Sequence, residues 1–198
     1  MGRRVSNFES MDRRKRERLR LRFFPAHLKP LFVGESPPAS GRFFYRGDSG
    51  LYRAVRDAFR AADPLTTDDN FLSAFKDSGC YLVDLCPDPV DRLGSKQRRA
   101  ACRAGELPLS RTIARLSPVA IVIVVRSIEI NVARAAFRAN WHGTVLALPY
   151  PGRWSQHRNS FIEGLAPTIR ELILRLNDSG IPARDSELSV PLRHCQRD

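Results

Sequence analysis

Short apolar runs and amphipathic segments alternate along most of this chain. The run at 119–125 (VAIVIVV) is rich in β-branched residues and contains no polar residue, which is typical of a parallel strand covered on both faces. Four apolar runs predict buried strands, at 31–35, 80–85, 119–125 and 144–148. Elsewhere apolar residues recur at helical spacing, and predict helices at 49–62, 69–76, 96–103, 109–116, 128–140 and 155–177.

Strands that alternate with helices predict an α/β domain. Right-handed crossovers make successive strands parallel and place helices on both faces of the sheet. We therefore expect a three-layer α/β/α sandwich with a central, mainly parallel four-stranded sheet. The predicted domain covers residues 30–178, after a basic N-terminal arm of residues 1–29 and before a C-terminal tail of residues 179–198.

The chain is strongly basic. Its 33 Lys and Arg residues outnumber 21 Asp and Glu residues, so the formal net charge is +12. Arginine favours planar, bidentate contact with phosphate, and a polyanionic partner, most simply nucleic acid, is the first expectation. A ribosome-associated or merely soluble basic protein is the alternative. The arm is either a solvated segment or one that follows the phosphates of a bound strand.

Several classes of protein are disfavoured. No stretch reaches the roughly 18 apolar residues of a membrane span, and the charged N-terminus does not resemble a signal peptide. We therefore expect a cytoplasmic monomer without a membrane partner. The cysteines should then be reduced thiols, and none of their spacings suits zinc, so no metal is expected. They are Cys80, Cys86, Cys102 and Cys195.

The most distinctive segment is 34–38 (GESPP), directly after the first predicted strand. Its two prolines impose a rigid, extended turn. Open α/β sheets bind ligands beyond the carboxyl ends of their strands. A carboxylate, a hydroxyl and the aromatic pair Phe43 and Phe44 are therefore expected near one another, which suits the binding of a flat polar ring.

Taken in order, the residues after each predicted strand resemble the uracil-DNA glycosylase superfamily, and within it the bacterial and archaeal iron–sulfur type. The resemblance covers residues 31–174, most of the chain. The family motifs are GEAPG, G-x-P-F, an Asn that ends the second strand, and H-P-S or H-P-A after the fourth. The corresponding residues here are Gly34-Glu35-Ser36-Pro37-Pro38, Gly41-Arg42-Phe43-Phe44, Asp84, and Tyr150-Pro151-Gly152.

This resemblance implies a DNA-repair enzyme that hydrolyses the N-glycosidic bond of a flipped uracil or related deaminated base, with DNA as its partner. Glu35 would position the attacking water, with the Ser36 hydroxyl beside it. Tyr150 replaces a histidine that stabilises the departing base, and His157 is the other candidate for that role. The alternative is a catalytically weak or inactive superfamily member that binds nucleic acid.

The resemblance also implies how the base and the DNA are bound. Phe44 would stack on the flipped base, with Phe43 or Tyr45 as alternatives, and such stacking stabilises by about 1–3 kcal/mol. Trp154 would act near the duplex or would instead cap the core. The other implied base-binding residues are Gly34, Pro37 and Asp84, and the implied DNA-binding residues are Arg42, Arg153, Trp154, Ser155 and Arg158.

Two departures from the family pattern change these expectations. An ionised Asp84 only accepts hydrogen bonds, whereas an amide also donates, so we expect a specificity shifted from plain uracil unless a raised pKa keeps Asp84 protonated. An ion-pair or helix-capping role outside the pocket is the alternative for Asp84. Only Cys86 and Cys102 match ligand positions of the family cluster, and four thiolates are needed. We therefore expect no iron–sulfur cluster and no other cofactor.

Overall fold

Four parallel strands form the centre of the protein. The computed structural model describes residues 13–152 and 154–178 of the 198-residue chain. The strands lie in the order β2-β1-β3-β4, and each neighbouring pair is parallel. They are β1 (Pro30–Gly34), β2 (Tyr81–Asp84), β3 (Ala120–Ile123) and β4 (Thr144–Ala147). The predicted four-stranded sheet is confirmed.

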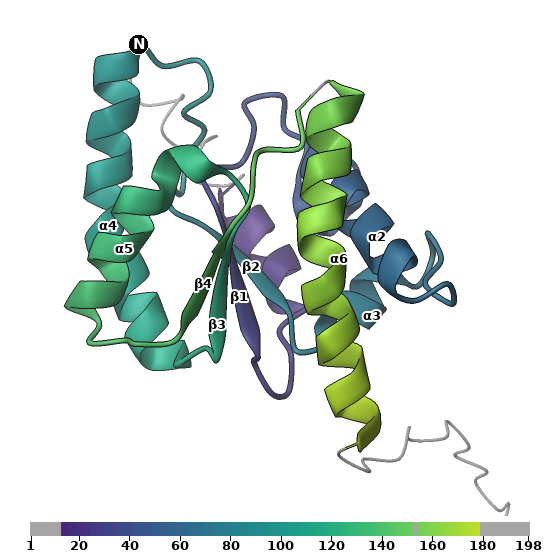
Figure 1. Ribbon diagram of the computed structural model, residues 1–198. Coiled ribbons are helices and arrows are strands. Elements are labelled where there is room, and N and C mark those ends of the chain that lie inside the picture. Colours follow the sequence, from purple (N-terminus) through teal and green to yellow (C-terminus); the bar gives the residue numbers. More distant parts are fainter. Residues whose placement is uncertain (1–12, 153, 179–198) are drawn as a thin grey trace, which may run out of the picture.

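Helices cover both faces of this sheet (Figure 1). One face carries α4 (Ser95–Leu116) and α5 (Glu129–Arg138), which pack against each other. The other face carries α2 (Gly50–Ala62) and α6 (Ser155–Asp178), with the short α3 (Phe71–Asp77). The turns η1 (Phe44–Arg46) and η2 (Arg126–Ile128) follow β1 and β3. The expected three-layer α/β/α sandwich is thus confirmed, and no described helix is long and apolar enough to span a membrane.

The two central strands hold the most buried part of the core. Leu31, Phe32 and Val33 of β1 and Ile121 and Val122 of β3 are fully buried. Helices on both faces remove the alternation of apolar and polar positions that a half-exposed strand shows. The same coverage explains why these strands could be predicted from continuous apolar runs.

One continuous helix, α4, replaces the two helices predicted at 96–103 and 109–116. It runs through Pro108, although proline removes a helix hydrogen bond and costs about 3 kcal/mol in a helix interior. Pro108 itself is exposed, whereas Gly105 and Leu109 are buried against the domain. Packing on both sides of the proline therefore outweighs the local cost.

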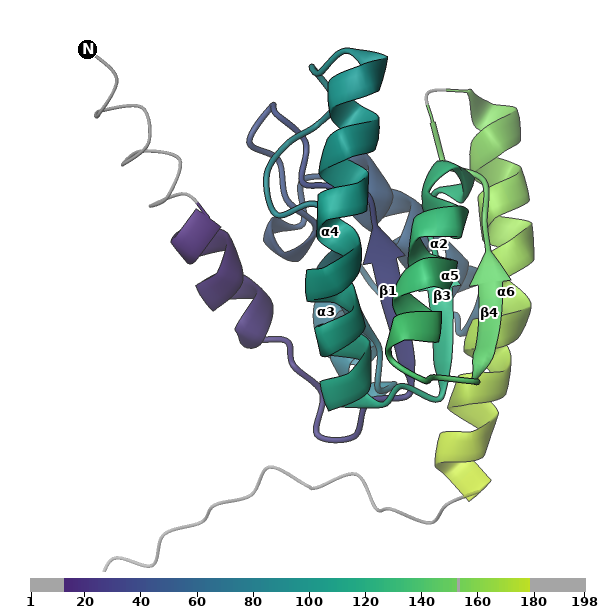
Figure 2. The same cartoon turned by 90° about the vertical axis from the view of Figure 1, so that its left-hand side faces the viewer.

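The described part of the basic arm packs against the domain. Residues 13–21 form a helix that lies to one side of the layers, at the edge where β2 is the outermost strand (Figure 2). Phe23 stacks on Tyr45 with ring centroids 5.6 Å apart, and Phe24 meets the edge of Tyr81 at 4.9 Å. The first part of the arm, residues 1–12, and the predicted tail, residues 179–198, lie outside the described residues.

Gly105→Ala should lower the free energy of unfolding by about 1–3 kcal/mol, the usual cost of overpacking a core. A Cβ there would overlap the carbonyl oxygen of Leu85 and lie 3.0 Å from its carbonyl carbon. Urea unfolding followed by circular dichroism measures the change. Gly50→Ala is the control, because a Cβ at Gly50 meets no atom within 4 Å. Equal unfolding free energies for the two variants would contradict the close packing of α4 on the segment after β2.

Candidate functional site

A cavity of about 720 Å³ opens beyond the carboxyl ends of the strands. Gly34 and Glu35 at the end of β1 and Val124 and Val125 after β3 contribute to its lining. The chain leaves β1 toward β2 on one side and leaves β3 toward β4 on the other. Ligands of open α/β sheets bind at such a switch of direction, so the fold places the cavity where a ligand site is expected.

Most of the predicted site residues meet in this cavity. Those that line it are Gly34, Glu35, Ser36, Pro37, Arg42, Phe43, Phe44, Asp84, Tyr150 and Arg158. Trp154, Ser155 and His157 are exposed at the start of α6 and lie outside the lining. Arg153 lies outside the described residues. The strand ends thus converge as expected. His157 lies next to the lining residue Gly152, where an added Cβ would lie 3.7 Å from Nδ1 of His157 and 3.9 Å from Cδ1 of Tyr150.

The carboxylate of Glu35 is held by a guanidinium that sequence reasoning did not find. Arg98, in the first turn of α4, donates from Nε to Oε1 at 2.6 Å and from Nη2 to Oε2. The hydrogen bond to Glu35 raises the pKa of Arg98, and the Cys102 thiol lies 3.7 Å from Oε1. The side chain of Glu35 is only 14% exposed. This bidentate contact therefore fixes a shielded carboxylate in one orientation.

The second carboxylate in the cavity wall, Asp84, is paired with Arg20 from the helix at residues 13–21. Nη2 of Arg20 donates to Oδ2 of Asp84 at 2.7 Å, and the Asp84 side chain is 8% exposed. Burial raises the pKa of Asp84, and the charge of Arg20 opposes that rise. Asp84 therefore both lines the cavity and forms an ion pair, which combines two roles that the sequence analysis treated as alternatives.

Close approach of two strand ends explains the glycine of the first motif. Gly34 pairs with Asp84 in the register of β1 and β2. A Cβ at Gly34 would lie 3.0 Å from Oδ1 of Asp84, which is tighter than ordinary van der Waals contact. The absence of a side chain at Gly34 thus makes room for the Asp84 carboxylate.

Phe43 and Phe44, the aromatic pair predicted to stack on a base, are largely buried in the core. Phe44 is 3% exposed, and its ring contacts the rings of Tyr45, Tyr52, Phe71 and Phe75. The guanidinium carbon of Arg20 lies 5.6 Å from the ring centroid of Phe43, which is 2% exposed. Both rings border the cavity, but stacking of a base on either face requires this part of the lining to shift.

Hydrogen bonds join the two loops that carry the first and second motifs. Oγ of Ser36 accepts from the backbone N–H of Val90 at 3.3 Å. The Asp91 carboxylate accepts from the N–H of Ala39 at 3.1 Å. Ser36 therefore braces the loop after β1 against the loop after β2, a structural role beside the catalytic one predicted for it.

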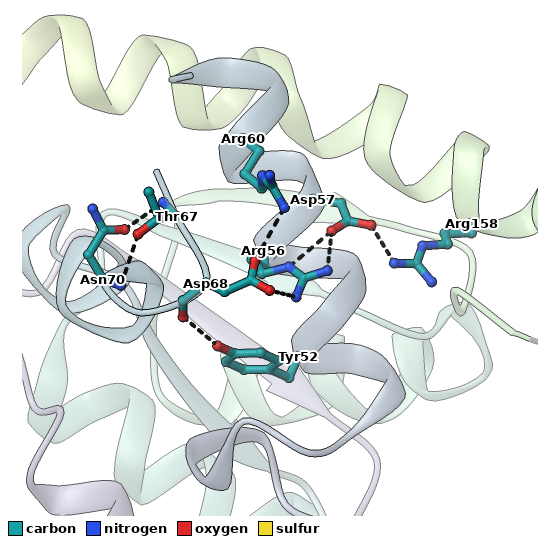
Figure 3. A network of polar contacts seen from close by, with 8 residues as sticks. All are labelled: Tyr52, Arg56, Asp57, Arg60, Thr67, Asp68, Asn70 and Arg158. Atoms are coloured by element: carbon teal, nitrogen blue, oxygen red, sulfur yellow. Dashed lines mark hydrogen bonds and ion pairs between the residues drawn. The ribbon is translucent and has the colours of Figure 1, made fainter. Parts of the chain in front are cut away.

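Three further arginines line the cavity. Arg42, Arg53 and Arg158 all contribute to the lining. Figure 3 shows that Arg158 bonds to Asp57 of α2, which also accepts from Arg56 at 2.9 Å. Although burial raises the pKa of Asp57, hydrogen bonds from Arg158 and Arg56 lower it below the ordinary value. The positive charge of Arg158 is thus partly neutralised by α2, while Arg42 is exposed.

The described cysteines do not fit the four-thiolate cluster of the iron–sulfur glycosylases. The sulfur atoms of Cys86 and Cys102 are 3.8 Å apart, and burial raises the pKa of Cys86 to about 12. Cys80 precedes β2 and Cys86 follows it, so they lie at opposite ends of that strand. Cys195 is outside the described residues. Within residues 13–152 and 154–178, no three His, Cys, Asp or Glu side chains form a metal-binding group.

Fold and cavity together define a class: a three-layer α/β/α protein with a polar ligand cavity at the switch point of a parallel sheet. Comparison with models of protein families and with curated proteins finds no match for the chain. The resemblance to the uracil-DNA glycosylases therefore stays a prediction, which depends on the strand-end residues gathered in the cavity.

Arg20→Met should lower the free energy of unfolding by about 3 kcal/mol at pH 7, because it leaves a buried carboxylate without its partner. Burial raises the pKa of Asp84, and an acid with a raised folded-state pKa loses stability as the pH rises through that value. The loss should therefore be smaller at pH 4 than at pH 7. Urea unfolding at both pH values measures it.

Two further variants serve as controls for this ion pair. Arg18→Met changes an exposed arginine of the same helix and should have little effect. Adding Asp84→Asn to Arg20→Met removes the unpaired charge. The double variant should regain most of the lost stability, and its difference from wild type should no longer depend on pH. An Arg20→Met variant as stable as Arg18→Met at pH 7 would contradict the ion pair.

Proposed function

We propose that the protein is a DNA glycosylase that hydrolyses the N-glycosidic bond of a flipped, deaminated base. The supporting observation is that Glu35, Asp84 and Tyr150, which follow or end three different strands, line one cavity. Its volume of about 720 Å³ is large enough for a flipped nucleotide. Removal of the base from the stack makes the glycosidic bond accessible. We further propose that the protein acts in the cytoplasm as a monomer and without a cofactor.

The cavity supplies groups for each part of this reaction. Water forms a bond to C1′ of the sugar while the bond from C1′ to the base nitrogen breaks, and the base leaves with the bonding electron pair. In this proposal Glu35 orients the water and receives its proton. The Tyr150 hydroxyl, in a side chain that is 52% exposed, donates a hydrogen bond to the departing base. Arg158 adds positive charge to the same wall.

The ion pair between Arg20 and Asp84 disfavours the uracil carbonyl to which an amide at this position would donate. An ionised Asp84 accepts from a ring N–H or an exocyclic amine, and it repels a carbonyl oxygen. Arg20 at 2.7 Å stabilises that ionised form, although burial opposes it. We therefore propose that the preferred substrate presents a donor, and not a carbonyl, to Asp84.

Binding of nucleic acid without base excision is a second candidate function. The observation that favours it is the bidentate contact of Arg98 with both oxygens of Glu35. The guanidinium occupies two acceptor positions of the carboxylate and so leaves fewer for an attacking water. In this alternative the cavity would recognise a damaged or unpaired nucleotide.

Glu35→Gln should reduce base excision at least about 100-fold, the usual contribution of a general base, because the amide cannot accept the proton of the attacking water. Single-turnover cleavage of duplexes that contain uracil, hypoxanthine, xanthine or an alkylated base measures this rate. Asp91→Asn is the matched control, since it changes another carboxylate of the cavity lining, and should retain activity. Salt-sensitive binding of the same duplexes by wild type, with no abasic product, would support the second function instead.

Asp84→Asn should shift the preference toward uracil, because an amide donates to a uracil carbonyl while it still accepts from the ring N–H. The measurement is the ratio of single-turnover rates on uracil and on the best other base, for wild type and variant. A wild type active on uracil alone, with an equal rate in Asp84→Asn, would contradict the proposed role of Asp84.

A further inference from the structure

A second, smaller hollow lies behind the ion pair between Glu35 and Arg98. Its volume is about 400 Å³, and Glu35 and Arg98 line both this hollow and the larger cavity. The rest of its lining comes from α4, η2 and α5. The residues in addition to Glu35 and Arg98 are Arg99, Cys102, Arg103, Ser127, Ile130, Asn131 and Arg134. The two spaces therefore share one wall.

Positive charge in this hollow exceeds the negative charge available to neutralise it. Four guanidinium groups line it, against the single carboxylate of Glu35, which is already bound by Arg98. Glu106, buried beneath, accepts from Asn131 at 2.7 Å and lies 3.5 Å from Arg134. Among the described residues, the side chains of Arg99 and Arg103 form no hydrogen bond and no ion pair, and both residues are exposed. Their two charges are therefore uncompensated.

The spacing of these two arginines gives the hollow a specific chemistry. Arg99 and Arg103 are four residues apart on α4, so they project from the same face of the helix. Like charges at this spacing destabilise a helix, and a bound anion would remove that repulsion. Guanidinium groups bind phosphate oxygens in pairs, and the exposed Ser127 adds a hydroxyl donor. A phosphate group suits this set of donors.

We propose that the hollow binds a backbone phosphate of a nucleic-acid strand whose neighbouring nucleotide enters the larger cavity. A nucleotide that leaves the stack keeps its flanking phosphates outside the pocket that holds its base, and the hollow adjoins that pocket across the pair of Glu35 and Arg98. The bound nucleic-acid strand would then pass from the arginines that line the larger cavity, over Arg98, to α4. This inference shares its DNA partner with the proposed function but does not depend on catalysis.

The test compares two double variants that remove the same charge from the same helix. Arg99→Ala/Arg103→Ala empties the hollow of its unpaired arginines, and Arg111→Ala/Arg115→Ala removes two exposed arginines at the same spacing. Fluorescence anisotropy measures the binding of a labelled duplex that contains a stable abasic analogue, between 50 and 200 mM salt. Each lost phosphate contact lowers the slope of log K against log salt by about 0.9.

We expect the first double variant to bind at least about tenfold more weakly and with a salt slope smaller by about 1, and the second to keep the slope of wild type. Equal affinities and slopes for the two would overturn the proposal. Urea unfolding verifies that both are folded. A loss of slope in a protein without base excision would support the site and contradict only the proposed reaction.

Inorganic phosphate, titrated against chloride at equal ionic strength, separates the two sources of a phosphate group. If the hollow binds only a phosphate of a nucleic-acid strand, millimolar inorganic phosphate should shift the melting temperature of wild type no more than that of the first double variant. Stabilisation of wild type alone by phosphate, with no difference between the double variants in DNA binding, would show a site for free phosphate and would overturn the assignment to a strand.

Discussion

Two carboxylates at adjoining strand ends determine how the rest of this protein is arranged. Parallel pairing puts Gly34 opposite Asp84, and Glu35 follows Gly34 directly, so both acids face the same cavity. A shielded carboxylate is unfavourable without a partner. Arg20 and Arg98 supply the partners, from the helix at 13–21 and from α4. The demand for charge compensation thus helps to hold α4, from one layer, and the helix at 13–21, from beside the layers, at the carboxyl ends of the strands.

This compensation divides the cavity into two electrostatic regions. Two ion pairs at the strand ends largely cancel, while the lining also carries the guanidinium groups of Arg42, Arg53 and Arg158, of which Arg158 is paired with Asp57. In the proposed complex these arginines would attract the phosphates of a polyanion, and an uncharged base would meet the paired groups. Such a division suits a nucleotide that enters with its base inward and its phosphates outward. It also suits the basic composition of the chain better than a small acidic ligand would.

The sheet and most of the cavity residues could be predicted because their signals are local. Continuous apolar runs identify buried parallel strands, and parallel strands bring the residues that follow them to one edge. The two ion pairs could not be predicted, since Glu35 and Arg98 are 63 residues apart and Arg20 and Asp84 are 64 apart, with no periodic pattern linking them. Packing around Pro108 overrode its local preference, and the burial of Phe44 among core rings depends on residues from three helical elements.

The contact with Arg98 is compatible with a catalytic role for Glu35, but it selects which role. A carboxylate has about four acceptor positions, and the bidentate guanidinium occupies two of them. Water can therefore still bind at the remaining acceptor positions. The transition state of glycosidic cleavage carries positive charge on the sugar. In the proposed reaction a carboxylate fixed by Arg98 therefore orients the attacking water and stabilises the charge on the sugar, and it receives the water's proton as the bond to C1′ forms.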